Sequence, residues 1–167
     1  MAAAMRVNSE MLATDLLLMN CPDKYNIMSA TNIQFSVAVH MMAGLGFHEG
    51  QEVTSTNLAS SVNAAPSFVR QILSKLSKHG LVVATQGKNG SCVLARDPSK
   101  ITLLEIYRAI DPPAAFAIHS YPVQRGCQVS SNIKGCMMKV LSDGQHVFER
   151  SLAKRTVADV VSEIRGS

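Results

Sequence analysis

The most constraining feature of this sequence is a pair of short helical patterns followed by a pair of short β-type runs. Residues 54–62 have the composition of a short helix, residues 63–66 (Asn-Ala-Ala-Pro) form a corner, and residues 67–78 form a second helical pattern that His79 and Gly80 end. Asn, Pro and Gly favour tight corners and helix ends. These patterns therefore predict a helix-turn-helix.

Two apolar runs, residues 81–85 and 92–95, follow the second helix on either side of a turn-rich segment, residues 86–91. Short apolar runs that flank glycine, asparagine and serine are typical of a β-hairpin. The expected fold is therefore mainly α with a small β-hairpin, which is the arrangement of a winged helix-turn-helix domain.

The second helix divides into an apolar face and a polar face. The apolar face consists of Phe68, Val69, Ile72, Leu73 and Leu76. The polar face consists of Ser67, Arg70, Gln71, Ser74, Lys75 and Lys78. The apolar stripe predicts burial against neighbouring helices. The polar face contains no acidic residue. Because this helix also follows a tight corner and precedes a hairpin, we interpret the polar face as a nucleic-acid contact rather than as an ordinary solvated surface.

The overall composition permits nucleic acid as a partner without requiring it. The 167 residues include 16 Lys and Arg against 12 Asp and Glu, which gives a formal net charge of +4 and a pI near 9.0. Binding depends on positive charge collected on one face rather than on a large total. No apolar run approaches the roughly 18 residues of a membrane-spanning helix and no signal peptide is evident, so we expect a soluble, cytoplasmic protein.

The chain before the helix-turn-helix is interpreted as an extension and one helix. Residues 1–27 are rich in Ala and Met, and we expect them to be poorly ordered unless they pack on the body. The winged helix-turn-helix domain is expected to span residues 28–112. Its first helix begins after Thr31 or Asn32 and ends at the Gly-Leu-Gly of residues 44–46. Its apolar side is expected to consist of Ile33, Val37, Ala38, Met41 and Met42.

A long amphipathic helix dominates the C-terminal part of the chain. It follows a compact helix at residues 101–110 and a loop at residues 113–130, and it continues from Ser130 or Ser131 to about Leu152. A helix of this length and apolar content has no obvious partner within so small a chain. The C-terminal segment, numbered 131–167 and ending in a short helix, is therefore expected to form a homodimer.

Several strings occur in the order and at the spacing of one known family. They are residues 65–76, 79–82, 94–96, 101–106 and 109–111, together with Gly90 in the hairpin. On these strings the chain, from about residue 29 to residue 164, resembles the Rrf-type winged helix-turn-helix transcriptional regulators of bacteria. The resemblance implies a homodimeric transcription factor, usually a repressor, that binds a double-stranded DNA operator.

The resemblance also implies which residues contact DNA. The recognition helix enters the major groove, where Arg70 and Gln71 are expected to read bases while the two lysines of the helix hold phosphates. The wing lies along the minor groove, and Gln86 occupies a position where the family often has Arg. Gln carries no charge and so favours a narrow A·T groove less than Arg does. The charge of Lys88 is expected to replace that of the missing Arg in part. The candidate DNA-binding residues are Ser67, Phe68, Arg70, Gln71, Ser74, Lys75, Lys78, Gln86 and Lys88.

The cysteines are the second departure from the family pattern. Iron-sulfur members have three closely spaced cysteines before the long helix, whereas this chain has only Cys127 and Cys136 in that region. A cluster needs four ligands, so His119, His146 or a partner chain would have to contribute. We therefore expect no cofactor, and we interpret the loop at residues 113–130 as a thiol-based sensor loop.

A reversible disulfide between Cys127 and Cys136, within one chain or between subunits, is the expected form of this switch. Cys136 is expected near the start of a helix, where unpaired N–H groups favour a thiolate. Cys92 in the hairpin is the next candidate, and Cys21 is interpreted as incidental. Two alternatives stay open: an iron-sulfur or metal sensor, and cysteines that have no role.

Other classes of function have less support in the sequence. An enzyme would use Cys127 as nucleophile with His119 as base, but the chain has no Cys-x-x-Cys, phosphate-binding loop or paired carboxylates. We therefore predict that the protein is not an enzyme. A further alternative is a winged helix that serves as a protein-interaction module without redox control. Salt distinguishes the two, because phosphate contacts weaken steeply as salt rises.

Overall fold

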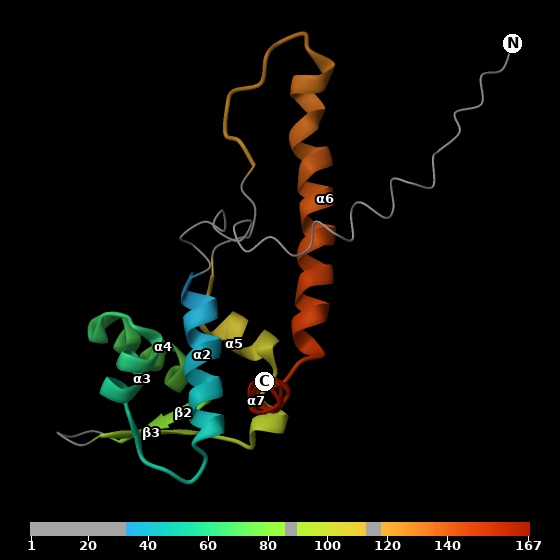
Figure 1. Ribbon diagram of the computed structural model, residues 1–167. Coiled ribbons are helices and arrows are strands. Elements are labelled where there is room, and N and C mark those ends of the chain that lie inside the picture. Colours follow the sequence, from blue (N-terminus) through green and yellow to red (C-terminus); the bar gives the residue numbers. More distant parts are fainter. Residues whose placement is uncertain (1–32, 86–89, 113–117) are drawn as a thin grey trace, which may run out of the picture.

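The computed structural model describes residues 33–85, 90–112 and 118–167, which form a helical body, a small sheet and one projecting helix (Figure 1). The predicted extension at residues 1–27, with Cys21, lies outside the described residues. No helix in the described part of the chain is long and apolar enough to cross a membrane. The elements are α2 (Ile33–Phe47), β1 (Val53–Thr54), α3 (Ser55–Val62), α4 (Pro66–Lys78), β2 (Val82–Ala84), β3 (Ser91–Leu94), the 3-10 helix η3 (Pro98–Lys100), α5 (Leu103–Ala109), α6 (Gln128–Ala153) and α7 (Val157–Arg165).

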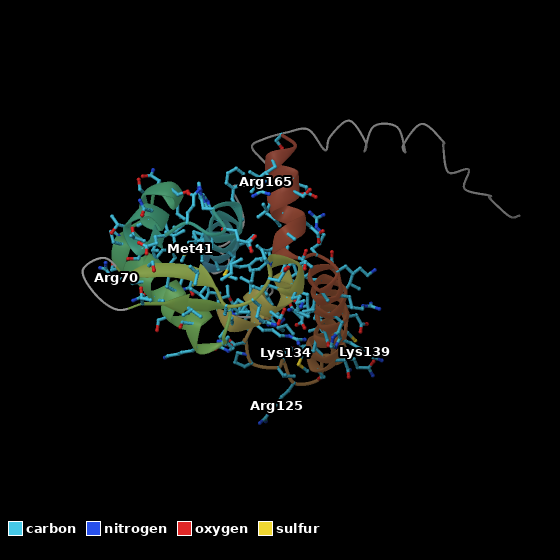
Figure 2. The ribbon with its side chains drawn as sticks, turned by 90° about the horizontal axis from the view of Figure 1, so that it is seen from below. Met41, Arg70, Arg125, Lys134, Lys139 and Arg165 are labelled. Atoms are coloured by element: carbon cyan, nitrogen blue, oxygen red, sulfur yellow. The ribbon has the colours of Figure 1, made fainter. Side chains whose placement is uncertain are left out.

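α2 is the centre of the body, because α3, α4, α5, α7 and β3 all pack around it. The side chains of Met41 and Met42 are fully buried there, and Figure 2 shows Met41 between the helices. Ile33, which is predicted to lie on the apolar side, is half exposed. The buried face therefore begins about one turn into the helix, at Val37.

α2 ends at Phe47, beyond the Gly-Leu-Gly segment that is predicted to end it. α7 packs against this segment. A Cβ atom at Gly46 would lie 3.2 Å from a methyl carbon of Val161 and 3.3 Å from one of Val157, which is closer than most Cβ contacts. Gly46 therefore permits the close approach of α7, and the helix ends in the turn that follows.

The predicted helix-turn-helix is confirmed, together with the local signals that form it. Thr54 caps α3, because its hydroxyl oxygen accepts from the Asn57 N–H while the Asn57 side chain accepts from the Thr54 N–H. Asn63 ends α3 in the left-handed conformation (φ 56°), which asparagine adopts more readily than most residues. Pro66 is the first residue of α4, a position where a missing N–H has little cost.

The hairpin belongs to a three-stranded antiparallel sheet with strand order β1-β3-β2. The two predicted apolar runs form β2 and β3, in which Val83 lies opposite Val93. β1 pairs Val53 with Cys92 and so connects the segment before α3 to the wing. A strand of two residues has no periodic pattern, so the sequence does not predict β1.

α6 packs on the body through its C-terminal part and extends away from it in the other direction (Figure 1). Gln145 donates to the hydroxyl of Tyr107 on α5 at 3.1 Å, and the ring of Phe148 meets the Tyr107 ring edge-on at 5.3 Å. α7 returns to the body, where Val157 and Val161 join the core. The last helix therefore packs with the winged helix-turn-helix domain, whereas the predicted domain division groups it with the long helix.

Candidate nucleic-acid interface

The exposed face of α4 carries cationic and hydrogen-bonding side chains. The exposed residues are Ser67, Arg70, Gln71, Ser74, Ser77 and Lys78. All residues of α4 are described and none is acidic, so its positive charge is not neutralised within the helix. Figure 2 shows Arg70 on the opposite side of the body from Lys134 and Lys139 of α6. The candidate wing residues Gln86 and Lys88 lie outside the described residues.

A groove of about 420 Å³ separates α4 from the hairpin. Arg70, Ser74 and Lys78 line it from the helix, and Thr85 and Gly90 line it from the hairpin side. α4 and the described part of the hairpin therefore face each other across this groove. Helix-turn-helix proteins place such a second helix in the major groove of DNA, with contacts to the backbone on either side.

Two of the predicted DNA-binding residues on α4 are placed differently. The ammonium group of Lys75 donates to the side-chain oxygen of Gln34 at 3.0 Å and to the carbonyl oxygen of Ile110 at 2.8 Å, so it connects α4 to α2 and α5. Phe68 is partly buried against the core. Lys75 and Phe68 therefore have contacts within the body, in addition to the phosphate and base contacts that the sequence predicts for them. Ser77 lines the groove and is missing from the prediction, although it continues the polar spacing of the helix.

α6 begins at Gln128, before the predicted start, so it contains Cys136 and directly follows Cys127. Cys127 is the N-cap, and its sulfur accepts a hydrogen bond from the Ser130 N–H at 3.5 Å. Cys136 is eight residues further than Gln128, beyond the first turn in which N–H groups lack helical partners. The position next to unpaired N–H groups therefore belongs to Cys127, which corrects the prediction for Cys136.

The same helix separates Cys127 from Cys136. A rise of about 1.5 Å per residue over nine residues places their Cα atoms about 13.5 Å apart along the axis, about twice the distance that a disulfide spans. A rotation of about 100° per residue also places them on opposite sides of α6. The predicted disulfide within one chain is therefore incompatible with this helix.

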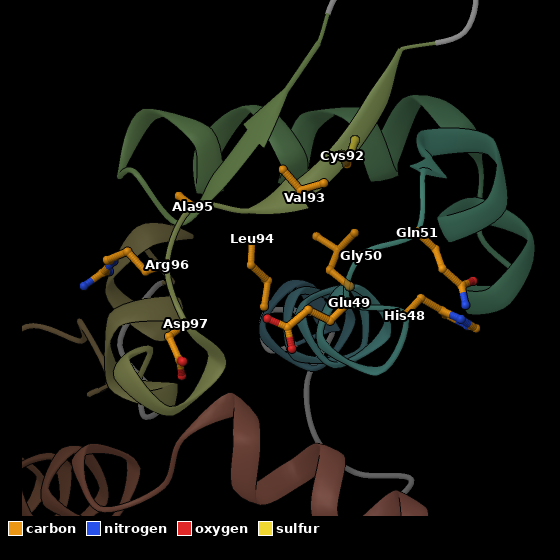
Figure 3. A pocket seen from close by; sticks show the side chains of 11 residues that line it. His48, Glu49, Gly50, Gln51, Cys92, Val93, Leu94, Ala95, Arg96 and Asp97 are labelled. Carbon is orange, nitrogen blue, oxygen red and sulfur yellow. The ribbon is translucent and has the colours of Figure 1, made fainter.

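Cys92 lies in β3 and its side chain is buried. Figure 3 shows it among the residues that line a pocket, together with His48, Glu49 and Arg96. Burial raises the pKa of the Cys92 thiol. A buried, protonated thiol reacts poorly with oxidants, so Cys92 has the character of a core residue rather than of a sensor.

A family model described as "Rrf2: Iron-dependent Transcriptional regulator" matches residues 31–163. The chain belongs to the Rrf2 family. YwnA of Bacillus subtilis (strain 168), provisionally named an HTH-type transcriptional regulator, is 31% identical over 134 residues, which cover 80% of this chain and 98% of YwnA. The protein is therefore a transcriptional regulator of the Rrf2 family, and the enzyme alternative with Cys127 and His119 is dismissed.

Two solved structures resemble this Rrf2 chain in fold. A provisionally named transcriptional regulator from Lactobacillus plantarum is 28% identical, with a TM-score of 0.69 over 80% of this chain and 91% of that one. IscR of T. potens is 23% identical, with a TM-score of 0.58 over 79% of this chain and 85% of that one. These likenesses confirm the winged helix fold that the sequence predicts.

The family description names iron, but the described residues of this Rrf2 chain do not form a ligand set for it. Cys127 and Cys136 lie on opposite sides of α6. Within the three described ranges, no group of three or more His, Cys, Asp or Glu side chains is close enough together to hold a metal ion. An iron-sulfur cluster is usually held by four ligands. The donor set among the described residues of one chain therefore does not fit such a cluster.

Proposed function

We propose that this Rrf2 regulator is a homodimeric, sequence-specific DNA-binding repressor that reads its operator with α4 and the wing. The main support is the exposed face of α4, which combines cations with amide and hydroxyl groups and has no acidic residue. Arg70 and Gln71 suit bidentate contacts to base edges, whereas Lys78 suits a phosphate. Gln86 and Lys88 are assigned to the minor groove beside the wing.

We expect the protein to bind DNA from the region upstream of its own gene, with an affinity that falls steeply as salt rises. Six or more phosphate contacts predict a loss of roughly a thousandfold between about 50 and 200 mM salt, because each contact releases counterions. Fluorescence anisotropy with labelled upstream DNA measures this slope. Absence of binding at low salt, or binding that does not depend on salt, would instead favour the protein-interaction module.

An uncovered apolar stripe on α6 supports the homodimer. The α6 stripe consists of Val129, Ile133, Met137, Val140 and Val147, all exposed in the single chain. Residues at these spacings share one face of a helix, and a contiguous exposed apolar face marks an interaction surface. A second copy covers two such stripes at once, because a two-fold interface uses the same patch on both subunits. The two-fold pairing also supplies two recognition helices for half-sites about 34 Å apart.

Cys136 has the spacing of the α6 stripe, so it faces the same side as these apolar residues. Gln145 donates to Tyr107 of α5, and Cys136 is the middle residue of the part of α6 before Gln145, residues 128–144. In a two-fold dimer the residue at the helix crossing meets its own copy. We therefore assign the proposed thiol switch to the two Cys136 residues of the dimer, in place of the bond between Cys127 of one subunit and Cys136 of the other that the sequence analysis also allows. Cys127 lies on the other side of α6.

Mild oxidation with hydrogen peroxide is expected to join the two Cys136 thiols of a dimer. Each thiol gives up one proton and one electron, and the peroxide is reduced to two molecules of water as the S–S bond forms. On non-reducing electrophoresis, wild type and Cys127→Ser are expected to migrate as covalent dimers and Cys136→Ser as a monomer.

DNA binding measured on the same samples shows whether this bond controls the repressor. A covalent dimer holds the two α4 helices at a fixed separation, so the oxidised wild type and Cys127→Ser are expected to change in operator affinity while Cys136→Ser does not. A covalent dimer that forms in Cys136→Ser, or that needs Cys127, contradicts the assignment.

A further inference from the structure

A groove with an apolar floor lies between α2, α3 and α7, and no residue of α4 or α6 lines it. Its floor contains Ala43 and Gly44 of α2, and its walls contain Ser61 of α3 and Val160 and Ile164 of α7. We call this site the α2 groove; Figure 1 shows α2 between α3 on one side and α7 on the other. Its volume of about 470 Å³ is within the range of small-molecule sites, roughly 300 to 1,000 Å³.

The polar side chains that line the α2 groove are hydroxyl and imidazole groups, which can donate hydrogen bonds. The Nε2 atom of His40 lies 3.0 Å from the hydroxyl oxygen of Ser61, which joins α2 to α3 across the groove. At the other end, Phe47 lines the groove; the guanidinium of Arg165, which does not line it, lies over the Phe47 ring, 5.1 Å from its centre, and donates to the Phe47 carbonyl oxygen at 3.1 Å. His48 lines the same end.

No acidic residue is among the described residues that line the α2 groove. The acidic residues of the adjoining helix α7 are held by partners outside it. Asp159 accepts hydrogen bonds from Thr156, and Glu163 pairs with Arg155 at 2.6 Å. The groove therefore combines an apolar lining with hydroxyl and imidazole groups and no carboxylate, which complements an anion that carries an apolar body.

We infer that the α2 groove binds a small carboxylic acid with an aromatic or branched aliphatic body. The carboxylate accepts hydrogen bonds from His40 and Ser61, and the body lies against Phe47, Val160 and Ile164. Hydrogen bonds to a charged group are stronger than neutral ones, while the apolar walls contribute through burial. The size of the groove favours such a ligand over a protein segment, because a stable protein interface buries about 800 Å² on each partner.

A ligand in the α2 groove has a direct route to the recognition helix. Ser61 is two residues before Asn63, which forms the corner between α3 and α4. A carboxylate that replaces or strengthens the link between His40 and Ser61 therefore acts on the angle at which α3 meets α2. Such a ligand changes DNA affinity only to the extent that it binds the two arrangements of the helices differently. The ligand site itself does not depend on the proposed DNA-binding function.

Phenylacetate is a suitable probe, with phenylacetamide as an uncharged control of nearly the same shape. Isothermal titration calorimetry on the full chain is expected to show phenylacetate binding at least about tenfold more tightly than the amide, the ratio that one charge-assisted hydrogen bond provides. His40→Ala is expected to remove most of this difference. Ile164→Asp, at an exposed wall position, is expected to abolish phenylacetate binding through repulsion. His119→Ala removes an exposed histidine outside the groove and is expected to bind as wild type does.

Several results would overturn the inference. The first is equal affinity for the acid and the amide. The second is no binding of either compound at about 10 mM, a concentration at which a millimolar Kd is still measurable. The third is an equal loss of phenylacetate affinity in His40→Ala and His119→Ala. Light scattering on folded Ile164→Asp gives an independent check. If that substitution dissociates a dimer, the groove is a protein interface and the small-molecule site is wrong. Retained dimer with lost phenylacetate binding supports the inference even if DNA binding is not observed.

Discussion

Val140→Asp is expected to convert the dimer into a monomer and to lower operator affinity at least about a hundredfold. Val140 lies on the α6 stripe and is 61% exposed in the single chain, so the substitution leaves the fold of one chain intact. In the proposed dimer the same substitution buries two carboxylates without partners. An unpaired buried charge costs about 3 to 5 kcal/mol. This cost exceeds the free energy that corresponds to a hundredfold loss of association.

Met138→Asp is the matched control for Val140→Asp. Met138 is also an apolar residue of α6 and is 59% exposed, but a rotation of about 200° over two residues places it on the other side of the helix. Light scattering after size-exclusion chromatography is expected to show a monomer for Val140→Asp and a dimer for Met138→Asp. A dimer in both variants means that the interface lies elsewhere. Phe148 is a poorer choice, because its contact with Tyr107 makes it part of the α5 packing.

Arg70→Ala is expected to lower operator affinity by about ten- to a hundredfold and to lower affinity for random DNA far less. A lost bidentate base contact costs roughly 1 to 3 kcal/mol and relaxes specificity at one base position. Arg70 is exposed on α4 and lines the groove beside the wing, so its removal changes the surface rather than the core. Anisotropy titrations with operator and with shuffled DNA of the same length measure the two affinities.

Lys78→Ala is the comparison that separates base reading from charge. Lys78 lies on the same exposed face as Arg70, and loss of a phosphate contact weakens binding to all sequences alike while it reduces the salt slope by about 1. Lys75→Ala adds a structural control, since its ammonium group is held by Gln34 and Ile110. Equal losses for operator and shuffled DNA in Arg70→Ala contradict the assignment of Arg70 to a base.

The helix-turn-helix is predictable from the sequence because its determinants are local. The cap formed by Thr54 and Asn57 involves residues three positions apart, and the left-handed Asn63 and the first-turn Pro66 act through their own backbone preferences. The apolar stripe of α4 likewise depends only on the helical period. No distant contact is needed to locate these features, and the structure has them at the predicted positions.

Contacts between distant segments decided the remaining features. Lys75 belongs to the polar pattern of α4, but Gln34 and Ile110, 41 and 35 residues away along the chain, turn its ammonium group toward the body. Gly46 has the sequence signature of a helix end, yet the approach of α7 explains its lack of a side chain. A pattern within one segment cannot show which other segment will pack against it.

The candidate switch shows the same limit in the spacing of the cysteines. Cys127 and Cys136 are close in sequence, and a loop at Cys127 would allow them to meet. Whether they meet depends on where α6 begins. The hydrogen bond from the Ser130 N–H to the Cys127 sulfur makes Cys127 the N-cap of this helix. The sequence by itself determined that two thiols flank or enter a long amphipathic helix. Only the three-dimensional structure decided that they face opposite sides, because a continuous helix fixes both the rise and the rotation between two residues.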